Sequence, residues 1–147
     1  MWVKSFFNSF ESSSQTQELD QNKLAVAVCV ILLEVAHSDD EFTSEEEIIL
    51  KNLLKQKFNL SDEELDEVIE VSLDEREHAI DLWKFTHQIQ KNFSHEMRLN
   101  LIENIWELIF SDDHMHSHEH ALVNKLSNLL HIPHSELIQT KLKVLGK

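Results

Sequence analysis

The stretch Ser-Asp-Asp-Glu-Phe-Thr-Ser-Glu-Glu, at residues 38–46, decides how this chain is organised. The stretch Ser-Asp-Asp-His-Met-His-Ser-His-Glu, at residues 111–119, repeats it 73 residues later. Both fit the pattern Ser-Asp-Asp-x-x-x-Ser-x-Glu, and each lies between two apolar runs of helical character. We call these stretches the first and second acidic corners. Their recurrence predicts a duplicated fold in which each corner joins two helices.

The internal repeat extends beyond the corners. Leu53 recurs as Leu126 at the same spacing, and residues 60–65 align with residues 132–137 after the loss of one position. Each unit therefore reads helix, acidic corner, helix, short turn, helix. Two such units packed against each other would bury one shared core, with the segment from about residue 74 to residue 93 as the bridge.

The composition predicts an all-α protein. The chain has 147 residues, the size of one domain, yet it contains one Gly and one Pro. Tight hairpins favour Gly or Asn-Gly, whereas Leu, Glu and Lys, which are abundant here, favour helices. We expect residues 1–17 to form a short amphipathic segment and a linker, and residues 18–147 to form one all-helical domain.

Apolar spacing and capping residues predict the individual helices. We expect helices over about residues 19–36, 44–57, 61–73, 79–92, 95–110, 117–131 and 134–145, with residues 74–78 as a charged connection. Capping boxes are expected at Thr43-x-x-Glu46 and Ser61-x-x-Glu64, and Ser94 is expected to cap the helix after it. Apolar side chains predicted to face the core include Ile48, Leu73, Ile80, Trp83, Phe85 and Trp106.

The net charge of -14 limits the partners of the chain. Nucleic acid is excluded, because neutralising phosphates requires clustered Lys and Arg. The acidity serves solubility, or it attracts metal cations or a basic protein partner. We see no secretory signal and no apolar run long enough to span a bilayer, so we expect a cytoplasmic protein that does not associate with membranes.

The single cysteine, Cys29, lies in an apolar run and is predicted to be a buried hydrophobic residue. No cysteine–histidine nucleophile, phosphate-binding loop or cofactor motif accompanies it. We therefore predict that the chain is not an enzyme. The alternative is a metal-dependent hydrolytic enzyme that uses the paired carboxylates of the acidic corners for acid–base chemistry.

The acidic corners carry the candidate cation ligands. Carboxylate oxygens suit Ca²⁺, Mg²⁺ or Mn²⁺. The expected ligands are Asp39, Asp40 and Glu46 in the first corner, with Asp112, Asp113 and Glu119 as their copies. The first corner is not an EF-hand, because Leu50 stands where the twelfth, bidentate ligand is required. The alternative for Glu46 and Glu119 is that each caps a helix.

The second corner also carries alternating histidines. His116 and His120 are one helical turn apart if the helix begins near Ser117, a spacing used by two imidazoles that share one metal. Zn²⁺, Ni²⁺ or Cu²⁺ would suit such a pair. The alternative is a solvated cluster of histidines in a loop.

The corners resemble the motif of the tellurite-resistance TerB-like family, Ala-Asp-Gly-x-Ile/Val-x-x-x-Glu, which occurs twice in an all-helical domain. Asp39 and Glu46 match the acidic positions of that motif in the first corner, and Asp112 and Glu119 match them in the second. Serine replaces the alanine, aspartate replaces the glycine, and Phe42 replaces the aliphatic residue. The similarity covers roughly residues 20–145.

The resemblance implies a compact bundle of about seven or eight helices. TerB-like domains are linked to tellurite resistance and stress response, and their acidic residues have been proposed to bind metal. The domain is thought to act as an interaction module. The resemblance therefore implies a non-enzymatic acidic domain that binds a divalent cation, a protein partner, or both.

Overall fold

The computed structural model describes residues 17–37, 44–111 and 117–146, with the side chains of residues 17–21 and 117–119 left out. Within these ranges every regular element is an α-helix. The helices are α2 (Gln17–Ala36), α3 (Ser44–Phe58), α4 (Asp62–His78), α5 (Trp83–Asn92), α6 (His95–Phe110), α7 (Ser117–Leu129) and α8 (His134–Val144). The predicted all-α fold is confirmed.

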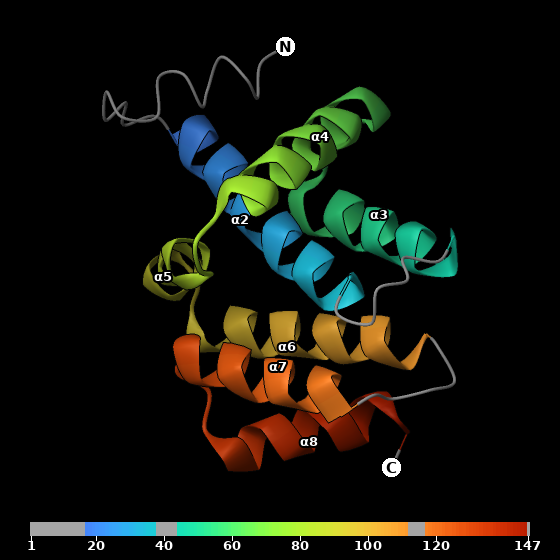
Figure 1. Ribbon diagram of the computed structural model, residues 1–147, viewed down its shortest axis with the longest axis vertical. Helices are drawn as coiled ribbons and strands as arrows, with labels where there is room; N and C mark the ends of the chain where they lie inside the picture. The colour runs from blue at the N-terminus through green and yellow to red at the C-terminus, as the bar shows by residue number, and fades with distance from the viewer. Residues whose placement is uncertain (1–16, 38–43, 112–116, 147) are drawn as a thin grey trace.

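Helix α2 is the centre of the core. Residues 25–33 are each at most 2% exposed, because a helix that is apolar around its whole circumference must be covered on every side. Helices α3, α4, α5, α6 and α7 all contact α2. Figure 1 shows α2 passing behind α4 and ending above the layer formed by α6, α7 and α8. One helix therefore contributes to the packing of both units.

Cys29 lies in this buried run, as predicted, and its side chain is fully inaccessible. Burial raises the pKa of the Cys29 thiol to about 12, against a smaller opposing effect from a hydrogen bond with Ser72. The thiol is therefore protonated at neutral pH and is not a nucleophile.

The two predicted units are present as three helices each. The first unit contains α2, α3 and α4, the second contains α6, α7 and α8, and α5 lies between them in the chain. In both units the first helix packs against the second and against the third. Figure 1 shows the second unit as the lower part of the molecule and the first unit as the upper part.

The repeat is visible in the backbone at the ends of α3 and α7. Asn59 and His131, which occupy equivalent positions, have φ values of 53° and 60°. These are the two described non-glycine residues with positive φ. Asn59 directly follows the last residue of α3, and His131 lies two residues after the last residue of α7. A left-handed residue is a common way to end a helix, and asparagine tolerates it better than most residues do. Both units therefore use a left-handed residue between their second and third helices.

Capping residues set the starts of α4 and α6. The Ser61 hydroxyl accepts a hydrogen bond from the Glu64 amide at 3.2 Å, and the Glu64 carboxylate accepts one from the Ser61 amide at 2.9 Å. This is the predicted capping box. Ser94 caps α6 by accepting a bond from the Met97 amide, also as predicted. The third predicted cap involves Thr43, which lies outside the described residues.

Two predicted helix boundaries are wrong. Residues 74–78 are not a connection but the last turn of α4, because helix formation continues through these charged residues on an exposed face. The next helix begins at Trp83 rather than at residue 79. Ala79 has an extended backbone, with ψ at 134°, and the Asp81 carboxylate accepts a hydrogen bond from the Trp83 amide.

Several apolar residues expected in the core face outward. Ile48 is 59% exposed and Leu73 is 44% exposed, since the neighbouring helices contact a different face of α3 and of α4. Ile80 is fully exposed because it lies in the connection between α4 and α5. Trp83 is 57% exposed and stacks on His87, whereas Phe85 and Trp106 are buried as predicted.

Candidate functional site

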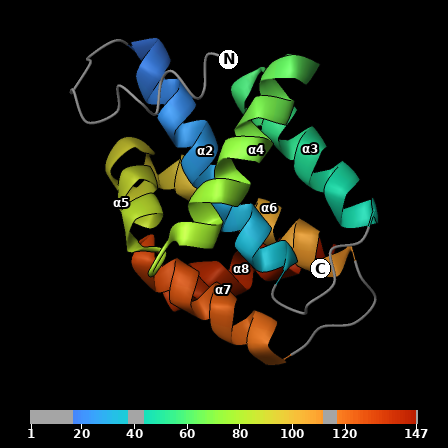
Figure 2. The same ribbon diagram turned by 45° about the horizontal axis from the view of Figure 1, so that its top comes forward.

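The helix ends next to the two acidic corners lie on the same side of the molecule. Figures 1 and 2 both place the end of α2, the start of α3, the end of α6 and the start of α7 together on this side. The arrangement follows from the duplication, because each corner joins the first and second helices of its unit.

The structure describes the side chains of Glu46 and His120 among the predicted ligands. Glu119 is part of α7, but its side chain is not described. The other predicted ligands lie outside the described residues, namely Asp39, Asp40, Asp112, Asp113 and His116. Their assignment as ligands stays a prediction.

Glu46 is a buried carboxylate in the first turn of α3. It is 5% exposed and lies in line with Leu50 and Leu54, the other buried residues of that helix. Burying a carboxylate is costly unless its charge is balanced. Backbone amides at the start of a helix attract negative charge in general. Glu46 therefore faces the core side of α3 at the edge of the first corner, with Glu45 and Glu47 exposed beside it.

His120 lies in the first turn of α7 and is held against an aromatic residue of α6. Its ring meets Trp106 edge-on, with centroids 6.2 Å apart and planes at 68°. Partial desolvation, and then the positive charge of Lys141, lower the pKa of His120 below its ordinary value of 6.5. His120 is therefore neutral at pH 7, the form in which imidazole binds metal ions.

Several described acidic residues away from the corners form ion pairs with basic side chains. Across the described ranges, no group of three or more His, Cys, Asp or Glu side chains is close enough to hold a metal ion. Individual carboxylates pair with basic partners instead. Glu34 accepts from Arg76 at 2.9 Å, Glu136 contacts His95 at 2.9 Å, and Glu103 contacts Lys143 at 3.2 Å. These pairs join different helices, so their role in the fold is structural.

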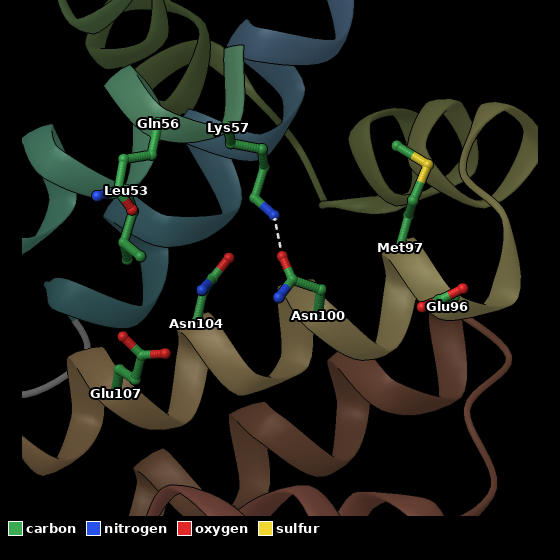
Figure 3. Close-up of a pocket in the computed structure, with 8 residues that line it drawn as sticks. All are labelled: Leu53, Gln56, Lys57, Glu96, Met97, Asn100, Asn104 and Glu107. Carbon is green, nitrogen blue, oxygen red and sulfur yellow. Dashed lines mark hydrogen bonds between the residues drawn. The ribbon is translucent and has the colours of Figure 1, made fainter. Parts of the chain in front are cut away.

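A groove between α3 and α6 was not predicted from the sequence. It has a volume of about 630 Å³ and is shown in Figure 3. Its lining residues are Leu53, Gln56, Lys57, Glu96, Met97, Asn100, Asn104 and Glu107. A signal was present in the sequence, because Asn100 and Asn104 are one turn apart and therefore share a face of the predicted helix.

Lys57 and Asn100 connect the two sides of this groove. Lys57 Nζ donates a hydrogen bond to Asn100 Oδ1 at 2.6 Å, as Figure 3 shows. Burial lowers the pKa of Lys57, while the negative charges of Glu107 and Glu103 oppose that shift. The groove is therefore polar and carries both signs of charge.

In the part of the chain that the structure describes, no helix is long and apolar enough to cross a membrane.

The helix order, the shared helix ends and the paired corners define a duplicated all-α module. The family model described as "Tellurite resistance protein TerB" matches residues 25–142, a span that includes both acidic corners and most of both units. This chain belongs to the TerB family, as the resemblance of its corners indicated. No curated protein and no solved structure matches it.

Proposed function

We propose that this chain is a non-catalytic, cytoplasmic TerB-family module that binds a divalent cation at its acidic corners and interacts with a protein partner. Its family description links it to tellurite resistance. The observation that carries the proposal is the position of Glu46. A carboxylate that is 5% exposed lies at the edge of the first corner, in a motif that the chain contains twice.

The chemistry of the corners supports a hard cation. Each corner supplies two adjacent aspartates and one glutamate, and these oxygen donors suit Ca²⁺, Mg²⁺ or Mn²⁺. Asp39, Asp40, Asp112 and Asp113 would bind the ion, and Glu46 and Glu119 would complete the two sets. The second corner adds His116 and His120, which would direct Zn²⁺ to that corner.

The hydrolase alternative receives no support from the described side chains. His95 is paired with Glu136, and the thiol of Cys29 is buried and protonated. The corners alone are the basis of that alternative. A module needs only to present its carboxylates, whereas an enzyme also needs a nucleophile or an activated water beside a substrate pocket.

Calorimetric titration of chelator-treated protein with Ca²⁺, Mg²⁺, Mn²⁺ and Zn²⁺ tests the cation site. Binding should weaken in Asp39→Ala and in Asp112→Ala, because each removes one charged ligand. Asp66→Ala is the matched control, since Asp66 is an exposed carboxylate on α4. Equal binding by all three variants, or no binding by the wild type, would show that the corners are not cation sites.

The histidine pair is tested separately. If Zn²⁺ binding depends on His116 and His120, replacing both with Gln should abolish it and leave Ca²⁺ and Mg²⁺ binding unchanged. Replacing His87 and His134 together with Gln is the control for loss of two histidines elsewhere, since both are exposed. Unchanged Zn²⁺ binding in the His116/His120 variant would assign the metal to other ligands.

A further inference from the structure

The groove between α3 and α6 contains a buried hydrogen-bond acceptor without a partner. Asn104 is 6% exposed, and its Oδ1 accepts no hydrogen bond from any described residue. Figure 3 shows this oxygen directed away from α6, into the space below α3. Buried polar groups in folded proteins are nearly always paired, so an unpaired acceptor that faces a groove points to a donor on a bound molecule.

We propose that this groove binds a short extended peptide segment of a partner protein, with Asn104 accepting a backbone N–H. The inference rests on the interaction role proposed above and assigns it a surface that uses none of the predicted corner ligands. The groove takes one wall from each unit, since α3 belongs to the first unit and α6 to the second.

The amides of the groove match the chemistry of a peptide backbone. Asn100 and Asn104 project from successive turns of α6, and Gln56 projects from α3 across the groove. A primary amide offers both a donor and an acceptor, as a peptide group does. A row of such amides therefore recognises an extended chain through its main-chain groups, largely independently of side chains.

The length of the groove suits about five residues. Glu96 and Glu107 mark its two ends on α6 and are 11 residues apart. This separation corresponds to about 16 Å along a helix axis. An extended chain rises about 3.3 Å per residue, so about five residues cover the same distance.

The charged residues of the groove determine which charges are favoured at the ends and at the centre of the peptide. Glu96 and Glu107 carry negative charge at the ends, where they favour basic residues on the peptide. Lys57 lies between them and disfavours a basic residue at the centre. Leu53 and Met97 add apolar wall, and the flexible Met97 side chain is 47% exposed and free to repack against different partners.

The test uses the fluorescein-labelled peptide Lys-Leu-Ser-Leu-Lys, with blocked ends, titrated with the full chain and followed by fluorescence anisotropy. EDTA is present so that no corner cation contributes, and ionic strength is held at about 0.15 M to screen the general attraction of an acidic protein. We expect saturable binding below about 1 mM, and at least tenfold weaker binding of Glu-Leu-Ser-Leu-Glu.

Asn104→Leu is the decisive variant. Leucine keeps about the same volume and removes the unpaired acceptor, so the protein should melt at the same temperature or higher while the peptide binds at least tenfold more weakly. A purely structural asparagine would give the reverse, with a lower melting temperature and unchanged binding. Asn124→Leu, at an exposed position on α7, is the matched control and should bind as the wild type does.

Two further variants separate this groove from the rest of the acidic surface. Glu107→Gln should weaken the basic peptide several-fold, whereas Glu63→Gln, at an exposed position on α4, should not. The Asp39→Ala/Asp112→Ala double variant should bind the peptide normally, so failure of the cation site would leave this result intact. The proposal is overturned if the wild type fails to bind, or if Asn104→Leu binds as well as the wild type.

Discussion

In the first unit, α2 and α4 are tied by the Ser72 hydroxyl, which donates to the Val26 carbonyl at 3.4 Å, and by the Glu34–Arg76 ion pair. In the second unit, α6 and α8 are tied by Trp106, whose indole N–H donates to the Thr140 hydroxyl at 3.1 Å. The two units share helix order and helix ends, but these hydrogen bonds and this ion pair occur at positions that are not equivalent in the repeat. Apolar packing and the helix ends therefore define the repeat, while each unit has its own polar contacts.

The largest loss of stability is expected from substitutions of Trp106 and of its equivalent in the first unit, Leu33. Both side chains are buried. Trp106→Ala should lower the free energy of unfolding by about 3–5 kcal/mol, and Leu33→Ala by about 2–5 kcal/mol. Trp106→Phe keeps most of the packing but leaves Thr140 without its donor, so it should cost about 1–3 kcal/mol. Urea unfolding curves measure all three. A Trp106→Phe variant as stable as the wild type would contradict a stabilising role for the indole hydrogen bond.

The next comparison is between Leu126 and Leu53, which are equivalent in sequence. Leu126 is fully buried, whereas Leu53 is only partly buried and lines the groove. Leu126→Ala should cost about 2–5 kcal/mol, and Leu53→Ala less than half of that, because only part of its side chain is removed from water. Thermal unfolding of the two variants measures the difference. Equal losses would mean that the groove is closed in solution.

A smaller effect is expected at the starts of α4 and α8. Ser61 caps α4 through its side chain, whereas its equivalent, Pro133, makes no side-chain cap for α8. Ser61→Ala should cost about 0.5–2 kcal/mol. Pro133→Ser should change stability by less than about 0.5 kcal/mol, because a new cap offsets the lost rigidity of proline in the unfolded chain. Chemical denaturation compares the two, and a large gain from Pro133→Ser would show that the proline strains the second unit.

The smallest expected effect is a pH dependence of opposite sign at two histidines. A hydrogen bond with the Asp74 carbonyl, and then the Asp74 carboxylate, raise the pKa of His78, while desolvation lowers that of His120. His78 therefore stabilises the fold below about pH 6.5 and loses this contribution as pH rises through its folded pKa. The contribution of neutral His120 is present above about pH 6.5 and is lost as pH falls through its folded pKa.

The two opposite pH dependences of stability can be measured by urea unfolding between about pH 5 and pH 8 with a chelator present. His78→Gln should reduce stability at the acid end of this range and leave the alkaline end unchanged. The free energy of unfolding of His120→Gln, relative to that of the wild type, should be higher at the acid end than at the alkaline end. Parallel shifts of both variants across the whole range would contradict the assignment of opposite signs.

The sequence predicted the features that depend on local chemistry. The apolar run of α2, the caps at Ser61 and Ser94, and the break between the helices expected over residues 44–57 and 61–73 all follow from side-chain type and spacing, and the structure confirms them. The duplication was predictable because a repeated pattern predicts a repeated chain path. The family was predictable from the two acidic motifs.

The features that depend on neighbouring helices were not predictable. Spacing shows that α3 has apolar residues at Ile48 and Leu53, but the buried face is set by where α2 lies and includes Glu46. The groove required the relative placement of α3 and α6, two helices 36 residues apart in the chain between their ends. The aspartates of the corners lie outside the described residues, so their role as ligands stays a prediction.

The burial of Cys29 gives the protein an internal reporter of its own opening. The chain has one cysteine, its side chain is inaccessible, and burial keeps its pKa near 12. A thiol reagent can therefore react only when α2 becomes exposed, so the labelling rate follows the opening of the central core rather than fraying at the surface. Labelling with and without a cation would compare the opening of the core in the two states without adding any probe to the protein.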